Sequence, residues 1–263
     1  MLNLYPLFSG SSGNMYLVES NNTNVLVDIG ISYKRANQAL NDIGKTFENI
    51  DAIVITHEHQ DHIQGLSTLL KKQNIPIYTS KGTSSAIRQK LKLTDNIQIN
   101  EIVADECFCI RDISITPFEI SHDAAMPLGY TIASEDKTLT IATDLGYVSE
   151  NIYSHLKEAN LSVIESNYDN TLLMYGPYNY NLKQRIKSNL GHLSNTDTAS
   201  VITNLAKDGK RSFILGHLSQ NNNNPDIAYS IITDTLKENG FNLDEFNINI
   251  ATRDFSSEVY SLW

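Results

Sequence analysis

The sequence predicts an α/β protein in which two mixed β-sheets pack together and helices cover their outer faces. Short β-rich runs alternate with helical patterns along the chain, and groups of strands followed by helices occur twice. A chain of 263 residues can bury a sizeable core, and neither a Pro-rich linker nor a low-complexity segment divides it. We therefore expect a single domain over residues 1–263.

The first part of the chain begins with three strands and then alternates strands with helices. Turns rich in Gly, Ser and Asn separate the first three apolar runs. The predicted elements are strands at 2–8, 15–20 and 25–30, a helix at 32–43, a strand at 51–56, a helix at 64–72, a strand at 76–80 and a helix at 83–91.

The middle of the chain is rich in strands, and the last part returns to alternating strands and helices. The predicted elements are strands at 107–110, 113–120, 128–134 and 138–143, a helix at 148–159, a strand at 161–166, helices at 182–190 and 196–207, a strand at 212–217, a helix at 226–239, and strands at 246–252 and 257–262.

The composition is that of an ordinary globular protein with an acidic surface. Hydrophobic residues make up 41% of the chain, and the formal net charge is −10 with a pI near 5.1. Such a charge argues against a broad basic surface that holds nucleic acid by counterion release alone. It does not exclude an enzyme that acts on nucleic acid, because bound divalent ions would add positive charge at one place.

The sequence indicates a cytoplasmic protein that does not enter membranes. The start MLNLYPLFSGSSGN lacks the basic and long apolar regions of an export signal, and no apolar run approaches the roughly 18 residues that span a membrane. The two cysteines, Cys107 and Cys109, lie two apart in a predicted strand and cannot build a disulfide framework. We expect them to be buried packing residues, with metal binding as a remote alternative.

A cluster of candidate metal ligands, THEHQDH, occupies residues 56–62 directly after an apolar strand and before a helix. His57 and His59 are two apart in an extended segment, so their side chains face the same way and can bind one ion. Asp61 and His62 fall in the turn into the helix and can reach a second ion. Imidazole and carboxylate without thiolate suit zinc, manganese or iron rather than a purely structural zinc. A surface loop rich in histidine by chance is the alternative, but three of the seven histidines lie here.

The pattern HxHxDH at a strand end resembles the signature of the metallo-β-lactamase superfamily, and the resemblance extends along the whole chain. It implies the αββα sandwich of that fold. A single His or Asp after a strand is more often structural, but three such residues follow in the order that the superfamily requires. On this resemblance, His57, His59 and His122 bind one ion, Asp61, His62 and His217 bind the other, Asp144 bridges both, and Asp28 supports the ligands from behind.

Two neighbouring divalent ions provide a general hydrolytic chemistry. They lower the pKa of a bridging water and supply hydroxide as a nucleophile at neutral pH, and they neutralise charge that develops on a phosphoryl or carbonyl oxygen. The fold itself does not choose the substrate, because lactams, thioesters, sulfonates and phosphodiesters are all hydrolysed on it. Residues outside the metal cluster must therefore indicate the substrate.

Three segments outside the cluster are candidates for substrate contact. The Gly/Ser turn at 9–14 has N–H groups that could bind an anion, with a plain hairpin loop as the alternative. The segment 182–195 places basic residues before His192, and the segment 216–225 has a polar run that could line a groove. The candidate substrate residues are Ser9, Ser11, Ser12, Asn14, Arg185, Ser219, Asn222 and Asn223.

Together, the motifs SGSSGN, GHLSN and HLSxxNNxP resemble the YycJ/WalJ family, a bacterial branch of the superfamily. The resemblance implies a metal-dependent 5′-to-3′ exonuclease that acts on double-stranded DNA, with a link to mismatch repair. It implies a catalytic role for Asp61, and for His192 as a donor to the phosphate or a general acid to the leaving oxygen. A histidine near a helix start without catalytic duty is the alternative for His192.

Tyr168 departs from the family pattern, which commonly has histidine at this position. A tyrosine can donate a hydrogen bond to phosphate, but near pH 7 it cannot act as a neutral metal ligand or a proton shuttle. Any role that the resemblance implies for this position is therefore in doubt.

Other functions of the same ligand set stay open. A small-molecule phosphodiesterase or a glyoxalase-like thioesterase would enclose its substrate in a pocket, whereas a nuclease needs an open groove. A metal-binding regulatory protein would keep the ligands without turnover. The interval between Asp144 and His217 has no room for the inserted domain of β-CASP nucleases, and no long Gly/Pro-rich arm of the tRNase Z type is evident. A secreted β-lactamase would need an export signal.

Overall fold

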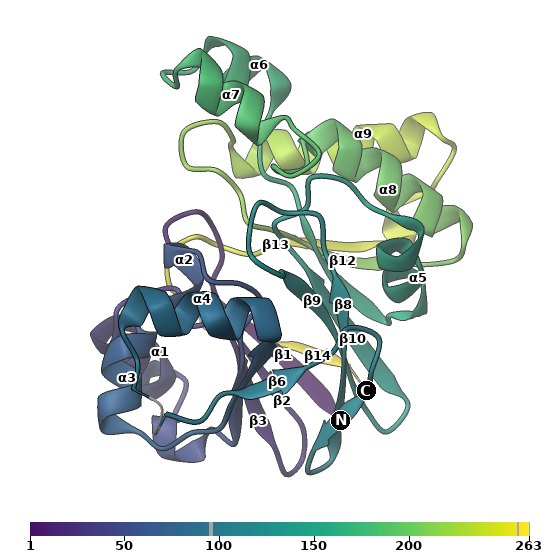
Figure 1. The fold of residues 1–263 in the computed structure, drawn as a ribbon. Coiled ribbons are helices and arrows are strands. Elements are labelled where there is room, and N and C mark those ends of the chain that lie inside the picture. Colours follow the sequence, from purple (N-terminus) through teal and green to yellow (C-terminus); the bar gives the residue numbers. More distant parts are fainter. Residues whose placement is uncertain (95–96, 257, 263) are drawn as a thin grey trace. The chain divides into compact units, whose positions relative to one another are not determined.

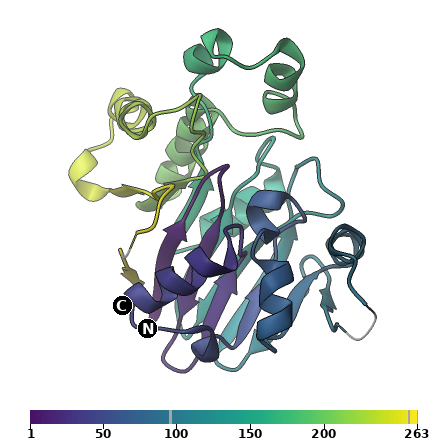
Figure 2. The same cartoon turned by 90° about the vertical axis from the view of Figure 1, so that its left-hand side faces the viewer.

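The described residues of the computed structural model, 1–94, 97–256 and 258–262, divide into two compact units. Unit 1 comprises Met1–Glu119, Ala124–Thr138 and Thr252–Trp263, and unit 2 comprises Ile120–Asp123 and Leu139–Ala251. The strands belong to two sheets with helices beside them (Figures 1 and 2), which confirms the predicted α/β class with two mixed sheets. The single domain over the whole chain stays a prediction.

Unit 1 contains the whole first sheet. In spatial order its strands are β14 (Tyr260–Leu262), β1 (Leu2–Phe8), β2 (Met15–Glu19), β3 (Asn24–Val27), β4 (Ala52–Val54), β5 (Ile77–Ser80) and β6 (Asn100–Ile102). The strands from β14 to β3 pair antiparallel, and those from β3 to β6 pair parallel because helical crossovers connect them. The short, partly exposed β6 was not predicted, and the first residue of the predicted strand 257–262 lies outside the described residues.

Helices of unit 1 lie along one face of this sheet (Figure 1). They are α1 (Tyr33–Asp42), the 3₁₀ helix η1 (Phe47–Asn49), α2 (Gln60–Ile63), α3 (Leu66–Lys72) and α4 (Lys81–Leu91). Their apolar faces bury Leu40, Leu69 and Ile87 in one core with Ile53 of β4. Serine caps set two of the starts: α4 begins two residues earlier than predicted because the Ser80 hydroxyl accepts a hydrogen bond from the backbone of the first turn.

Unit 1 also holds the antiparallel ladder of β7 (Phe108–Ile110), β8 (Ile113–Glu119) and β9 (Leu128–Ser134). Tyr130 of β9 donates its hydroxyl to the carbonyl of Ile55 at 2.6 Å, which ties the ladder to the segment after β4. The expectation that both cysteines are buried is wrong, because Cys107 and Cys109 are exposed. They do share a face of the strand, but Phe108 and Ile110 occupy the inward one.

Unit 2 is built on parallel strands of the second sheet. The strand β10 (Lys137–Ala142), whose last residues belong to this unit, pairs with β11 (Leu161–Glu165), β11 with β12 (Ser212–Gly216), and β12 with β13 (Asn247–Ile250), all parallel. Parallel strands end at the same edge of a sheet, so the residues that follow them are brought close together. This edge collects the polar side chains at the ends of β10, β11 and β12.

The helices of unit 2 are α5 (Glu150–Glu158), α6 (Asn170–Tyr175), α7 (Tyr180–Ile186), α8 (Asn195–Lys207), α9 (Pro225–Glu238) and the 3₁₀ helix η2 (Leu243–Glu245). A capping box of Ser194 and Asp197 starts α8, and Asn224 caps α9 with a proline at the first turn. The six-residue α6 was not predicted, because it is too short to show a helical period. Among the described residues, no helix is both long and apolar enough to cross a membrane.

Candidate metal centre

In unit 1, the predicted metal cluster follows the carboxyl end of β4 and enters α2. His57 and His62 are fully buried, whereas His59 and Asp61 are partly exposed, and His59 is the residue that precedes the helix. The rings of His57 and His62 have their centroids 4.0 Å apart, and those of His57 and His59 4.6 Å apart. The structure thus brings these histidines together as the sequence predicts.

Asp28, at the end of β3, organises this cluster from behind. Its carboxylate accepts hydrogen bonds from the backbone N–H of Thr56 at 2.8 Å and from the Thr56 hydroxyl at 2.9 Å, and it lies 2.7 Å from Nδ1 of His62. Burial raises the pKa of Asp28, because desolvation outweighs the opposing charge and hydrogen bond of His62. The residue therefore has the supporting position that the resemblance implies.

The network also determines which nitrogen of each ring carries the proton. The Thr56 hydroxyl donates its single proton to Asp28, so it can only accept from Nδ1 of His57, which lies 3.0 Å away. His62 likewise donates from Nδ1 to Asp28. In both rings the proton on Nδ1 leaves the lone pair on Nε2, which is the form that binds a metal ion.

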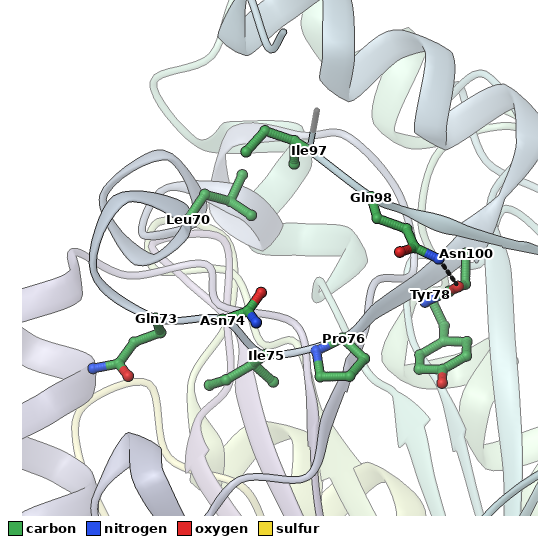
Figure 3. Close-up of a pocket in the computed structure, with 9 residues that line it drawn as sticks. All are labelled: Leu70, Gln73, Asn74, Ile75, Pro76, Tyr78, Ile97, Gln98 and Asn100. Carbon is green, nitrogen blue, oxygen red and sulfur yellow. Dashed lines mark hydrogen bonds between the residues drawn. The ribbon is translucent and has the colours of Figure 1, made fainter. Parts of the chain in front are cut away.

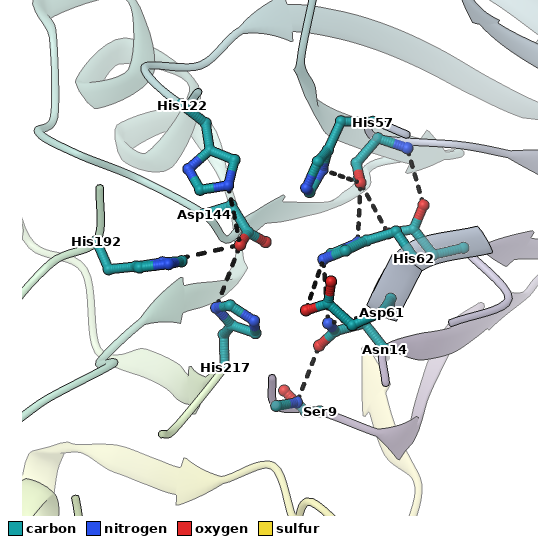
Figure 4. A network of polar contacts seen from close by, with 12 residues as sticks. Ser9, Asn14, His57, Asp61, His62, His122, Asp144, His192 and His217 are labelled. Carbon is teal, nitrogen blue, oxygen red and sulfur yellow. Dashed lines mark hydrogen bonds and ion pairs between the residues drawn. The ribbon is translucent and has the colours of Figure 1, made fainter. Parts of the chain in front are cut away.

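Backbone contacts fix the turn that holds Asp61 and His62. The N–H of Asn14 donates to the carbonyl of Asp61 at 2.8 Å, and the N–H of Gly30 donates to the carbonyl of Asn14 at 2.8 Å. Figure 4 shows the side chain of Asn14 beside Asp61 and His62, and its amide nitrogen lies 3.1 Å from Nε2 of His62. Gly30 is required here, since a Cβ at this position would lie 1.6 Å from the carbonyl oxygen of Asp61.

We expect Gly30→Ala to displace the Asp61–His62 turn, to lower the free energy of unfolding by about 3 kcal/mol, and to reduce the metal content of the folded protein. Denaturant unfolding and elemental analysis of the same preparation measure both. Gly44→Ala is the matched control, because its backbone is left-handed (φ 74°) but nothing lies within 4 Å of the added Cβ. This control should lose only about 1 kcal/mol and keep its metal. If Gly30→Ala and Gly44→Ala lose the same stability and keep the same metal content, the close contact between Gly30 and Asp61 is contradicted.

In unit 2, the polar residues at the strand ends and near α8 form the second group. Asp144 and His217 are buried, and His192 is partly buried just before α8. Figure 4 shows His122, His192 and His217 directed toward Asp144, whose Oδ1 lies 3.7 Å from Nε2 of His122 and 3.4 Å from Nδ1 of His217. These four sequence predictions are therefore brought together within one unit.

Glu165, the last residue of β11, is a member of this group that the sequence analysis missed. Its Oε1 lies 2.8 Å from Nδ1 of His192 and 2.7 Å from Nδ1 of His217, and its Oε2 accepts the backbone N–H groups of Leu145 and Leu193. Burial would raise the pKa of Glu165, but the charges and hydrogen bonds of the two histidines outweigh it, and the pKa lies below its usual value. An ionised carboxylate thus positions both rings.

Hydrogen bonding again selects the metal-binding nitrogen. The Nδ1 of His217 donates to Glu165, and the Nδ1 of His122 donates to the carbonyl of Gly191 at 3.1 Å, so each ring keeps its Nε2 lone pair. Ligand atoms of Asp144, Glu165, His192 and His217 lie within 4.8 Å of one another. Because both oxygens of Glu165 already accept hydrogen bonds, Asp144 and His217 are the better ligands of this group.

Residues at three strand ends share an unusual backbone conformation. Asp28 after β3 has φ 61°, Asp144 after β10 has φ 59°, and His217 after β12 has φ 54°. Non-glycine residues rarely adopt this left-handed region, and where they do, the surrounding contacts hold them in place, often at functional sites. In each unit, the chain turns sharply at the residue whose side chain joins the cluster of candidate metal ligands and their supporting carboxylates.

The candidate substrate residues near the N-terminus differ in position. Ser11 and Ser12 are exposed, and their contact with substrate stays a prediction. Ser9 is buried with its hydroxyl hydrogen-bonded inside the unit, and the buried Asn14 contacts His62. Ser9 and Asn14 therefore shape the turn and support the metal cluster.

The candidate substrate residues of unit 2 are mostly buried. Ser219, Asn222 and Asn223 are buried, and the Asn223 amide donates to two backbone carbonyls after β11. Arg185 is exposed but forms an ion pair with Asp123 through two guanidinium nitrogens. These buried side chains hold the loop after β12 in place, and their contact with substrate stays a prediction.

Tyr168 lies in a small apolar core with Leu173 and Ile186, beneath α6 and α7. Burial and the nearby carboxylates of Asp197 and Glu165 raise the pKa of Tyr168 to about 12. The phenol therefore stays neutral near pH 7.

A cavity of about 480 Å³ in unit 1 has a different chemistry from the metal cluster (Figure 3). Its polar lining consists of Tyr78 and the amide side chains of Gln73, Asn74, Gln98 and Asn100, and none of the described residues contributes a charged side chain to it. Asn100 donates to the carbonyl of Ile77 and accepts from Gln98. The described lining therefore offers no histidine, carboxylate or thiolate to a metal ion and no positive charge to a phosphate.

Comparisons with known proteins agree with this arrangement. Residues 23–218 match a family model described as Beta-lactamase superfamily domain. The chain is 37% identical over 234 residues to exodeoxyribonuclease WalJ of Streptococcus pneumoniae serotype 2, and the aligned region covers 88% of this chain and 87% of WalJ. It is 34% identical over 244 residues to exodeoxyribonuclease YycJ of Bacillus anthracis, covering 93% and 92%. The metallo-β-lactamase fold protein YhfI of Bacillus subtilis has a TM-score of 0.71 at 18% identity, covers 98% of both chains and supports the fold.

Proposed function

Because the chain belongs to the β-lactamase superfamily and, within it, to the family of the exodeoxyribonucleases WalJ and YycJ, we propose that it is a dinuclear exonuclease that degrades double-stranded DNA from the 5′ end. The class of enzyme, a metal-dependent hydrolase, follows from that membership. The observation that carries the proposal is the group in unit 2, where Glu165 positions both a metal ligand and His192.

The donors of the two units suit a pair of divalent ions. In each unit, histidines give Nδ1 to an oxygen acceptor and keep Nε2 for a metal, and a carboxylate lies among them. His57, His59 and His122 would hold one ion, Asp61, His62 and His217 the other, and Asp144 would bridge them. The absence of thiolate from this set favours manganese, zinc or iron at a hydrolytic site.

The ions and the protein have separate tasks in this proposal. Bound as a pair, the ions activate water near neutral pH and neutralise charge on the phosphate. His192 is oriented by Glu165, which accepts from Nδ1. In its protonated form the ring carries a second proton on Nε2, and this is the proton that it would donate to the substrate. Its ring is partly exposed, unlike the fully buried rings of His57 and His62, as a group that meets substrate must be.

The phosphodiester of DNA fits this division of tasks. Hydrolysis releases a sugar oxygen that must take up a proton, and His192 supplies a donor beside the carboxylate Asp144, with 3.8 Å between Nδ1 and Oδ1. The acidic surface of the chain makes the metal centre the strongest local attraction for phosphate, which suits an enzyme that engages the end of a strand.

Linear duplex DNA labelled at either the 5′ or the 3′ end tests the proposal. With Mn²⁺ present, we expect the 5′ label to be released first as a short product, while the 3′ label stays on long fragments until late. Chelation by EDTA should stop the reaction, and restored Mn²⁺ should recover it, because the ions supply the activated water.

Two outcomes would point to other functions. If metal-loaded protein leaves duplex DNA intact but cleaves bis-p-nitrophenyl phosphate, the enzyme is a small-molecule phosphodiesterase. If it binds metal and cleaves neither compound, the hydrolytic proposal is wrong and a regulatory metal-binding role gains support.

A further inference from the structure

The segment 170–191, which we call the α6–α7 arm, has a charge opposite to that of the chain. It contains three basic residues, Lys183, Arg185 and Lys187, and no acidic residue, whereas the whole chain has a net charge of −10. In Figures 1 and 2, α6 and α7 form an outlying pair beyond the other helices of unit 2. The arm is therefore a local positive feature of an otherwise acidic unit.

The arm also exposes large apolar side chains. Tyr175 is 82% exposed, Tyr180 73% and Met174 59%. Surface aromatic residues at this exposure have no packing role of their own, and together with positive charge they form the usual means of binding unpaired nucleic acid. The small core of the arm, with Leu173 and Tyr168, holds the helices in place beneath them.

A cavity of about 310 Å³ lies between these helices. Leu173 and Met174 provide apolar lining, the Tyr180 ring adds an aromatic side, and Lys187 lines it with a charged group. The volume lies at the small end of the about 300–1,000 Å³ that is typical of ligand pockets. One nucleobase with its phosphate near a lysine matches this lining.

The basic residues of the arm have different duties. The ammonium of Lys183 donates to the carbonyls of Met174 and Gly176 at 2.8 and 2.9 Å, so it fastens the end of α6. Arg185 pairs with Asp123. Lys187 is exposed and forms no ion pair with any other residue that the structure describes, which makes it the group suited to a phosphate.

The arm ends at the proposed catalytic histidine. The backbone N–H of His192 donates to the carbonyl of Ile186 at the end of α7, at 2.9 Å, and Gly191 provides the carbonyl that orients His122. A strand held on α7 is thus placed next to the segment that carries His192. Bases within a duplex stack on each other and cannot enter such a cavity, so only an unpaired strand presents a base to it.

We infer that the α6–α7 arm binds unpaired DNA, with one base in the cavity against Tyr180 and a phosphate at Lys187. The choice of DNA as the ligand rests on the proposed exonuclease function. The inference adds a substrate preference: ends with a single-stranded extension, or ends that fray, are held better than blunt ends.

Fluorescence anisotropy of metal-free protein with a fluorescein-labelled oligothymidylate tests this inference. Tyr180→Ala should weaken binding roughly tenfold or more, as loss of one stacked base does, and Tyr180→Phe should retain it. Lys187→Gln should reduce the dependence of log Kd on log salt by about 0.7. Tyr229→Ala on α9 and Lys207→Gln on α8, exposed residues of the same unit away from the arm, should bind as the wild type does.

A blunt hairpin duplex with the same label provides the comparison. Its binding should change little in Tyr180→Ala. If Tyr180→Ala binds the oligothymidylate normally, or loses duplex and single strand equally, the inference is overturned. Since the protein is metal-free, the binding result is independent of hydrolysis. If the arm binds the oligothymidylate as expected but metal-loaded protein degrades no DNA, only the proposed exonuclease function is contradicted.

Discussion

Replacing His62 by alanine should abolish the hydrolysis of DNA and lower the metal content of the protein. His62 is fully buried and donates from Nδ1 to Asp28, so it presents Nε2 to the ion from a fixed position. Loss of a group that merely supports a ligand already reduces metal affinity or activity by about 10- to 100-fold, so loss of the ligand should exceed about 100-fold. Asp61→Ala should behave in the same way.

His155→Ala is the matched control for this experiment. His155 lies in α5 of unit 2, outside both polar groups, and its substitution should leave metal content and activity near those of the wild type. Elemental analysis and release of label from duplex DNA measure the two quantities. Full activity of His62→Ala with a normal metal content would rule out the proposed ligand set.

Replacing His192 by alanine should slow DNA hydrolysis by about 10²- to 10⁴-fold, the usual contribution of a general acid, while the metal content stays unchanged. The reason is that His192 donates from Nδ1 to Glu165 and would donate from Nε2 to the substrate, whereas other residues would bind the ions. Single-turnover kinetics with metal-loaded protein measure the step directly. A fall in metal content that matches the fall in rate would instead make His192 a metal ligand.

Glu165→Gln distinguishes the positioning role from the catalytic one. The two oxygens of Glu165 accept four hydrogen bonds, two from histidine rings and two from backbone N–H groups. The single oxygen of a glutamine amide cannot accept all four. We expect both slower turnover and weaker metal binding, because His217 loses its partner together with His192. An unchanged metal affinity would show that Glu165 acts on His192 alone.

The sequence predicts the part of the site whose residues are close together along the chain. His57, His59, Asp61 and His62 lie within one turn after an apolar strand, so spacing alone brings them together. Asp144 and His217 are separated by most of unit 2, and their meeting depends on the parallel order of β10, β11 and β12, which only the superfamily resemblance implied.

Glu165 was missed because an acidic residue at the end of a strand carries no motif. Its importance comes from burial and from partners that lie 27 and 52 residues further along the chain. A usable signal existed: LSVIES places one acidic residue at the end of an apolar parallel strand, between the strand ends that supply Asp144 and His217.

One wrong prediction and two features that the sequence does not reveal have local physical causes. The exposed Cys107 and Cys109 follow from strand alternation, since Phe108 and Ile110 take the inward face. The polar run after His217 is buried because its amides bond to backbone carbonyls, which composition does not reveal. The left-handed backbone of Asp28, Asp144 and His217 likewise arises from tertiary contacts rather than from local propensity.

The number of metal ions bound per chain tests the central claim most directly. Purified protein equilibrated with Mn²⁺, freed of excess metal and analysed for metal and protein in the same sample should contain close to two ions per chain. Asp144→Ala, which removes the proposed bridge, should contain fewer. A wild-type value of one or none, reached under conditions in which the protein degrades duplex DNA, would contradict the proposed dinuclear centre.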